Sequence, residues 1–142
     1  MIAAPLPCTL PAARAAILAA PALRSLRPTV EHGGGPDRLI CHDLTGDGAT
    51  DLAVTIFSGG TAGDVAWVVF RPVDGAWKLA YAQLHAYKAA LVRSGRDLVE
   101  WQPVYRSGDA NCCPSGGFDA RRFSWNGRTF VVTSRRHSKT PP

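Results

Sequence analysis

Short apolar runs, separated by turns rich in glycine, proline and aspartate, fill the chain from residue 38 onward. These runs are rich in valine, isoleucine, phenylalanine and tryptophan, which is typical of β-strands. Hairpin turns are indicated where Asp74-Gly75 and Asn126-Gly127 separate two runs. The pattern predicts seven or eight strands within residues 38–42, 52–57, 65–70, 77–82, 87–92, 98–105, 118–125 and 129–133.

The first part of the chain has a different apolar period. Ala13 and Ile17 are one helical turn apart, and Leu18 and Ala20 continue the spacing. Thr9 can cap the N-terminus of a helix, and a proline at position 11 suits its first turn. Residues 9–20 are therefore expected to form a helix that ends at the proline of position 21.

These elements predict an α+β fold. An N-terminal helix packs on a mainly antiparallel β-meander, which either curls over the helix or closes on itself as a partial barrel. Strands joined by tight turns need no crossover helices. The 142 residues suit one domain, assigned here to residues 1–134. Residues 135–142 begin with Arg-Arg-His-Ser-Lys and are predicted to form a basic flexible tail.

Composition and charge argue against a disordered, a nucleic-acid-binding and a membrane-spanning protein. Hydrophobic residues make up 46% of the chain, which excludes wholesale disorder. The net charge is +5, but outside residues 135–139 the basic residues are scattered, so a nucleic-acid partner is not expected. Apolar runs stay shorter than the roughly 20 residues that cross a bilayer, so we expect no transmembrane segment.

The strongest chemical signal is the stretch Asp43-Leu-Thr-Gly-Asp-Gly-Ala-Thr-Asp51. Acidic residues occupy its positions 1, 5 and 9, and a glycine at position 6 permits a sharp turn, which is the spacing of a calcium loop. The alternative is a turn held by Asp side chains without a metal. The predicted calcium ligands are Asp43, Thr45, Asp47, the backbone carbonyl of Ala49, and Asp51.

This stretch resembles the calcium loops of FG-GAP repeats, which read D-x-[DN]-x-D-G-x-x-D-[LIV]. The resemblance implies that Asp43, Asp47, Asp51 and the Ala49 carbonyl bind calcium. Thr45 stands where the family has Asp or Asn, so the implied site has one charge fewer and binds calcium weakly. The chain holds a single copy of about a dozen residues, so the resemblance does not extend to the propeller fold.

A second resemblance covers more of the chain. Cys41-x-Asp-x-Thr-Gly-Asp-Gly is followed by Ser58-Gly-Gly-x-x-Gly63, a tryptophan-rich hairpin and Cys112-Cys-Pro-Ser115. This order resembles small secreted or lipid-anchored proteins of the LppP/LprE lipoprotein type, which implies an exported protein and no particular reaction. Cys8 follows Pro-Leu-Pro rather than the small residues of a lipobox, so a lipid anchor is not predicted.

The four cysteines, Cys8, Cys41, Cys112 and Cys113, also indicate an oxidising, extracytoplasmic compartment. Three pairings are open to them. We favour Cys8–Cys41, which would fasten the helix to the sheet, together with a vicinal Cys112–Cys113 bridge. The other two pairings link Cys8 and Cys41 separately to the adjacent pair.

These observations favour a monomeric, exported, non-enzymatic domain. It would bind an unidentified protein or glycan, or serve the cell envelope, and its calcium loop would be structural. One alternative is a hydrolase that combines Asp43 or Asp47 with His42 or His85. The other is an inhibitor-like module that binds a partner through residues 111–117.

Overall fold

The structure is a computed structural model that describes residues 5–142. Residues 1–4 of the predicted 1–134 domain lie outside the described residues. The elements are α1 (Leu10–Ala19), the 3-10 helix η1 (Pro21–Leu26), α2 (Arg27–Glu31), β1 (Gly35–His42), β2 (Asp51–Phe57), β3 (Asp64–Val73), β4 (Ala76–Gln83), β5 (Ala90–Ser94), β6 (Asp97–Pro103), β7 (Phe118–Trp125) and β8 (Phe130–Ser138). The predicted α+β class is confirmed.

Helix α1 begins and ends where its sequence indicates. The Thr9 hydroxyl accepts a hydrogen bond from the backbone N–H of Ala12 at 3.2 Å, which satisfies one of the free N–H groups of the first turn. Ala13 and Ile17 are fully buried against the sheet. Burial of this face fastens a ten-residue helix that would be marginal on its own.

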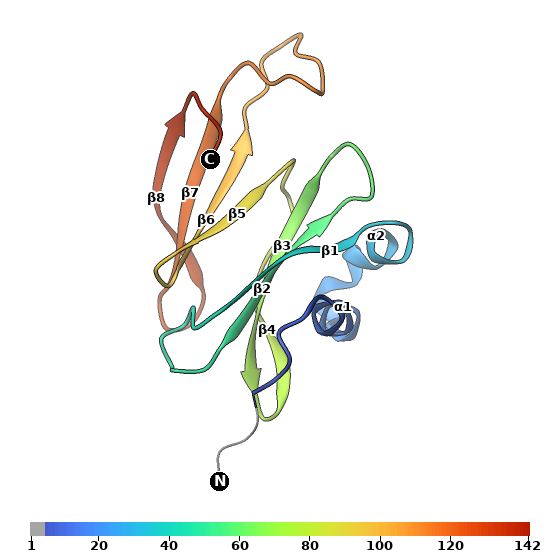
Figure 1. Ribbon diagram of the computed structural model, residues 1–142, viewed down its shortest axis with the longest axis vertical. Coiled ribbons are helices and arrows are strands. Elements are labelled where there is room, and N and C mark those ends of the chain that lie inside the picture. Colours follow the sequence, from blue (N-terminus) through green and yellow to red (C-terminus); the bar gives the residue numbers. More distant parts are fainter. Residues whose placement is uncertain (1–4) are drawn as a thin grey trace.

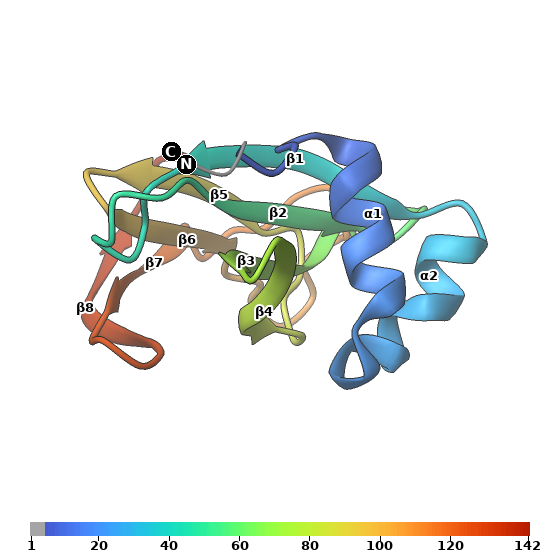
Figure 2. The same cartoon turned by 90° about the horizontal axis from the view of Figure 1, so that it is seen from below.

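The strands form two four-stranded antiparallel sheets, each in sequence order. Sheet A contains β1–β4 and sheet B contains β5–β8. Figure 2 shows the helices on one side of sheet A and sheet B on the other, so the molecule has three layers. Successive side chains of β2 point to opposite sides of sheet A: Val54 packs towards the helices and Ala53 towards sheet B.

The barrel alternative is wrong, because the sheets stay open and separate. Residues 84–89 carry the chain from one sheet to the other (Figure 1). Their backbone N–H groups do not extend a β4–β5 hairpin. Ala86 donates to Val65, Lys88 to Ala62, and Ala89 to Asp64. The fifth strand therefore starts at Ala90, three residues later than predicted.

The predicted tail boundary at residue 134 is also displaced. Strand β8 continues to Ser138, so residues 135–138 pair with β7. The basic side chains find partners there: the Arg136 guanidinium lies 4.9 Å from the Trp101 ring centre, and His137 Nδ1 lies 2.8 Å from a carboxylate oxygen of Asp119. In the sequence, a run of basic residues resembles a solvated tail. The sequence does not indicate the cross-strand contacts that these residues make in the folded protein.

Candidate metal site

The acidic stretch forms the connection between β1 and β2 of sheet A. Its two ends are held together, because His42 and Asp51 face each other as the last pair of the β1–β2 ladder. The residue before this pair, Cys41, is bonded to Cys8. The loop is therefore closed by a strand pair and a disulfide, which fixes where its side chains can point.

Asp43 organises the loop backbone. Its carboxylate accepts hydrogen bonds from the N–H groups of Thr45 at 3.3 Å, Gly46 at 2.7 Å and Gly48 at 3.0 Å. Desolvation raises the pKa of Asp43, but these N–H groups and the positive charge of Arg96 bring it below its ordinary value. Asp43 is consequently held as a carboxylate.

Asp51 lies beneath the loop and is fully buried. Its Oδ2 accepts hydrogen bonds from the N–H of Leu44 at 2.7 Å, the N–H of Thr45 at 3.1 Å and the Thr45 hydroxyl at 3.2 Å. Among the described residues, no group donates to its other oxygen, Oδ1. Burial, with the nearby charge of Asp47, raises the pKa of Asp51 despite the hydrogen bonds that oppose the rise.

Asp47 lies on the exposed side of the loop. Its Oδ1 accepts from the N–H of Ala49 at 2.9 Å, and its Oδ2 lies 3.3 Å from a guanidinium nitrogen of Arg71. Arg71 belongs to β3 and also lies over the ring of Trp125, 5.4 Å from its centre. The sequence pattern of the loop gave no sign of this partner, because Arg71 is 24 residues away.

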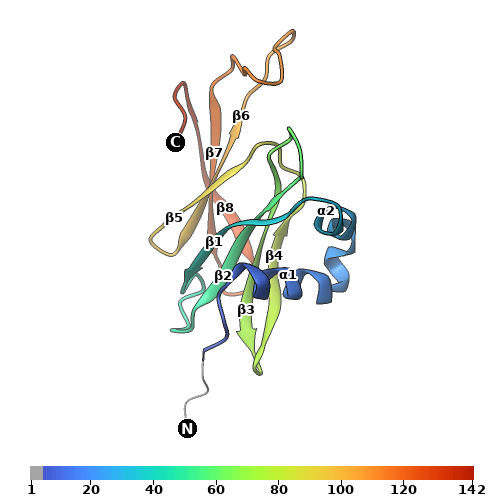
Figure 3. The ribbon, with the colours of Figure 1, turned by 45° about the vertical axis from the view of Figure 1, so that its right-hand side comes forward.

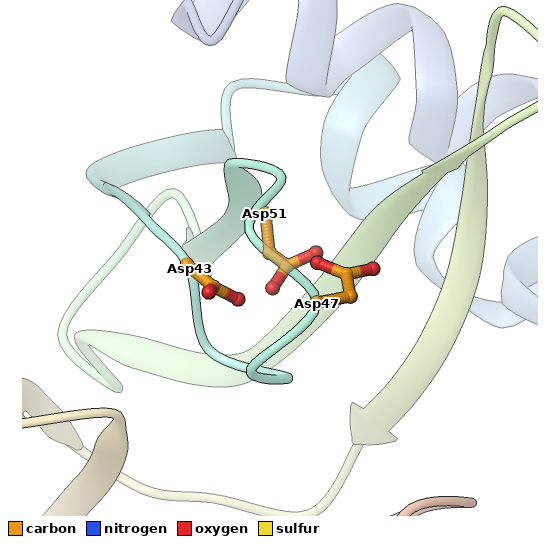
Figure 4. A group of neighbouring side chains, drawn as sticks. All are labelled: Asp43, Asp47 and Asp51. Atoms are coloured by element: carbon orange, nitrogen blue, oxygen red, sulfur yellow. The ribbon is translucent and has the colours of Figure 1, made fainter.

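The three carboxylates converge. Figure 4 shows the Asp51 carboxylate between those of Asp43 and Asp47, and one oxygen from each residue lies within 4.8 Å of the others. The Thr45 hydroxyl is bonded to the same Asp51, and Ala49 contacts Asp47 through its N–H. This cluster of oxygen atoms, with one unsatisfied buried oxygen, can hold a hard metal cation.

Both disulfides have the favoured pairing, Cys8–Cys41 and Cys112–Cys113. The first fastens the segment before α1 to the end of β1. The indole N–H of Trp77 on β4 supports the same segment by donating to the Pro7 carbonyl at 3.0 Å. The sequence could not reveal this second attachment, since it joins residues 70 positions apart.

The second disulfide belongs to the β6–β7 loop, which projects beyond both sheets (Figure 3). The Asp109 carboxylate braces the loop by accepting hydrogen bonds from the N–H groups of Arg106 and Ser115, which lower its pKa. Asn111 fastens the loop to the residues before β5: it accepts from the Tyr87 hydroxyl and the Lys88 ammonium group. The loop is therefore an ordered projection.

The residues of the hydrolase alternative do not form an acid–base pair. The Nε2 atom of His42 lies 3.5 Å from a guanidinium nitrogen of Arg93 on β5. Within residues 5–142, no hydrogen bond joins His42 or His85 to the three carboxylates.

In the part of the chain that the structure describes, no helix has the length and apolar character needed to span a membrane. Comparison of the sequence and structure with protein-family models, with curated proteins and with solved structures finds no match. The function must therefore be inferred from the site itself.

Proposed function

We propose that this protein is an exported, non-enzymatic domain whose β1–β2 loop binds a structural calcium ion. The observation that carries the proposal is the Asp51 carboxylate. It is fully buried, one of its oxygens has no donor within residues 5–142, and two further carboxylates lie beside it. A buried anionic oxygen without a partner is costly, and a bound cation removes that cost.

The ligand chemistry favours calcium. The cluster offers three carboxylates, and the Thr45 hydroxyl and the Ala49 carbonyl complete the predicted set. All of these are oxygen ligands, which calcium prefers in numbers of six to eight. The cluster contains neither histidine nor cysteine, so zinc and copper are poorly matched. Water molecules would supply the remaining ligands.

The two disulfides support the proposed extracytoplasmic location. Both pairs of cysteines are oxidised, which is the normal condition of secreted and envelope proteins and rare in the cytosol. Calcium is also abundant enough outside cells to fill sites with dissociation constants of about 10⁻⁴–10⁻³ M. A weak calcium loop therefore suits an exported protein.

Calcium titration of the metal-free protein tests the proposal. At about 100 times the dissociation constant, a ligand that binds only the folded state adds about 2.7 kcal/mol of stability. We expect a rise of several degrees in Tm with calcium, reversal by chelator and a smaller response to magnesium.

The matched variants are Asp51→Asn and Asp74→Asn. Asp51→Asn keeps the shape of the side chain and removes the buried charge, so the calcium response should disappear. Asp74→Asn removes the same charge from the exposed β3–β4 turn, where a φ of 51° suits asparagine, and should leave the response intact. An unchanged response in Asp51→Asn, or no response in the parent protein, would exclude the proposed site.

Partner binding through residues 111–117 is a second proposal, supported by the ordered β6–β7 loop. Cys112 and Cys113 are exposed, while Asp109 and Asn111 fix the position of the loop. A fixed loop loses little conformational entropy on binding, as inhibitor loops do. Replacing residues 110–114 by a glycine-serine linker should leave Tm nearly unchanged and abolish partner capture. A large fall in Tm would instead show that the loop is needed for the stability of the fold.

A further inference from the structure

The inner face of sheet B, which points towards sheet A, changes from apolar to polar along β6 and β7. Leu98 and Phe123 form a ladder pair whose side chains belong to the apolar core between the sheets. Because successive side chains alternate, every second ladder pair lies on this face. The next two such pairs are polar: Glu100 with Arg121, and Gln102 with Asp119. Figure 3 shows this end of β6 and β7 extending past the strands of sheet A, so the outermost pair is not covered.

A cleft of about 410 Å³ opens over these two polar pairs. The rest of its lining comes from Pro103, Val104 and Tyr105, at and just after the end of β6. Binding sites for small molecules commonly have volumes of about 300–1,000 Å³ and combine apolar walls with a few fixed polar groups. The cleft has the size and the mixed lining of such a site.

Glu100 fixes the polar groups at the base of the cleft, where its side chain is 1% exposed. Its Oε2 accepts a hydrogen bond from the indole N–H of Trp67 at 2.7 Å. Its Oε1 accepts from the Gln102 amide at 3.1 Å, and from Nε and Nη2 of Arg121 at 3.1 Å and 2.8 Å. A buried ion pair commonly adds no more stability than apolar residues of the same volume would. The network therefore points to a role in holding Gln102 and Arg121 in position.

The polar groups around the cleft keep hydrogen-bonding capacity of both kinds. Arg121 Nη1 and Asp119 Oδ2 make no hydrogen bond to other groups within residues 5–142. The Gln102 amide donates one of its two hydrogens to Glu100. The Tyr105 hydroxyl donates to the Asn111 carbonyl, so its oxygen can still accept. A ligand in the cleft thus meets fixed donors and fixed acceptors side by side.

These groups favour a neutral ligand with several hydroxyl groups. An anion would lie beside the buried Glu100 carboxylate and a cation beside the Arg121 guanidinium, where burial weakens screening. An extended peptide is recognised mainly by adding a strand to a free sheet edge. Strands β6 and β7 are each paired on both sides, so the cleft offers side chains and no free strand edge. A hydroxyl group donates and accepts at once, which matches this lining.

We propose that this cleft binds a neutral carbohydrate. Neighbouring hydroxyl groups of the sugar donate to Asp119 and accept from Arg121 and Gln102, while the C–H groups of the ring lie against Val104 and Tyr105. The cleft belongs to sheet B and uses no residue of the β1–β2 loop of sheet A. Carbohydrate binding should therefore be the same in calcium and in chelator, and it stands or falls independently of the calcium site.

NMR titration of the isotope-labelled protein with maltose, cellobiose, lactose and mannobiose tests the proposal. We expect at least one of these neutral disaccharides to shift the backbone amide signals of residues 98–105 and 118–121 in a saturable manner. Signals of the β1–β2 loop should stay unchanged. The disaccharide that binds most tightly is then used with the variants.

Asp119→Ala and Arg121→Lys remove one sugar contact each, and each should weaken binding about tenfold, the effect of one lost hydrogen bond to a charged group. Asp119 is exposed, and lysine keeps a positive charge beside Glu100, so both variants should fold. The matched controls are Asp97→Ala and Arg122→Lys, which alter an ion pair on the opposite face of the same sheet. They should change affinity less than twofold.

Several results would overturn the proposal. None of the disaccharides shifts the signals of the cleft, or the shifts lie elsewhere on the molecule. The two controls weaken binding as much as the two cleft variants. Glucuronate binds more tightly than glucose, or trialanine more tightly than every disaccharide, which would assign the cleft to anions or to peptides. Thermal unfolding of each variant precedes titration, and if Arg121→Lys does not fold, Asp119→Ala against Asp97→Ala decides.

Discussion

Arg71 acts as an internal counter-ion of the acidic loop. Its guanidinium lies 3.3 Å from the Asp47 carboxylate, and its buried Nε–H has no partner within the described residues. The ion pair is about one-third exposed on both sides, so its own contribution to stability is small. Arg71 would compete with the proposed calcium ion, because both need the same carboxylate.

Replacing Arg71 by glutamine should therefore raise calcium affinity. We expect an increase of about two- to fivefold, the range of one exposed ion pair, together with a lower Tm of the metal-free protein as the carboxylates lose a neutralising charge. Titration calorimetry of metal-free Arg71→Gln against Arg24→Gln measures the difference. Equal calcium affinities of the two variants would show that Arg71 does not compete with calcium. No calcium binding by either variant would reject the calcium site itself.

Asp64 gives a residue-level prediction about pH. Burial, followed by a hydrogen bond from the Asp37 carboxyl, raises the pKa of Asp64 from 3.8 to about 6. Between these pH values the Asp64 carboxyl is protonated in the folded protein and ionised in the unfolded chain. The contribution of Asp64 to the free energy of unfolding therefore falls as pH rises through that window. Above pH 6 the buried charge persists as a cost.

Asp64→Asn removes this titration. The variant should be about 2 kcal/mol more stable, relative to the parent protein, at pH 7 than at pH 4. Urea unfolding of both proteins at the two pH values gives this difference. Comparison with the parent cancels the carboxyl groups that do not interact with Asp64, whereas Asp37, its hydrogen-bond partner, contributes to the measured change. A difference of zero or of opposite sign would contradict the raised pKa.

At the scale of elements, the contact between α2 and sheet A depends on a glycine. A Cβ atom on Gly34 would lie 2.3 Å from the Phe57 carbonyl oxygen and 2.6 Å from Cγ2 of Thr29. The carbonyl belongs to the backbone at the end of β2, so it cannot move without disturbing the ladder. This close approach is what lets the chain turn from α2 directly into β1.

Gly34→Ala should therefore destabilise the fold by about 2 kcal/mol, the usual cost of forcing an extra methyl group into packed structure. Gly60→Ala is the matched control, since nothing lies within 4 Å of its added Cβ and its φ is not positive. Chemical denaturation measures both variants. Equal stabilities for the two would show that α2 can shift away from β2 at little cost.

Elements with local signals were predictable from the sequence, while contacts between them were not. The start of α1 at the Thr9 cap and the β3–β4 turn at Asp74-Gly75 are each determined by a few neighbouring residues. Both are present as predicted. The separation into two sheets depends on hydrogen bonds from residues 86–89 back to β3 and the turn before it, over 20 or more residues. The acidic triad was visible as spacing, whereas the burial of Asp51 and its unpaired oxygen needed the fold.

At the scale of the whole molecule, the two disulfides have unequal roles. Cys8–Cys41 spans 33 residues and joins the N-terminal segment to sheet A, whereas Cys112–Cys113 joins neighbours within one loop. A cross-link restricts the unfolded chain more when it closes a longer loop. Overall stability should therefore depend on the first bridge.

Replacing both Cys8 and Cys41 by serine should lower the free energy of unfolding by about 3–4 kcal/mol in the chain-entropy model. The matched Cys112→Ser/Cys113→Ser variant should lose much less, because it opens almost no loop. Urea denaturation under non-reducing conditions compares them. A larger loss from the vicinal pair would assign a global role to the β6–β7 loop.

The order of the strands also sets how quickly the molecule can assemble. Every strand pairs only with its neighbour in sequence, so both sheets form through short-range encounters, and the chain crosses between them once, through residues 84–89. Folding rates fall as the mean sequence separation of contacts rises. This protein should therefore refold faster than two-sheet proteins of its size whose strands are interleaved between the sheets.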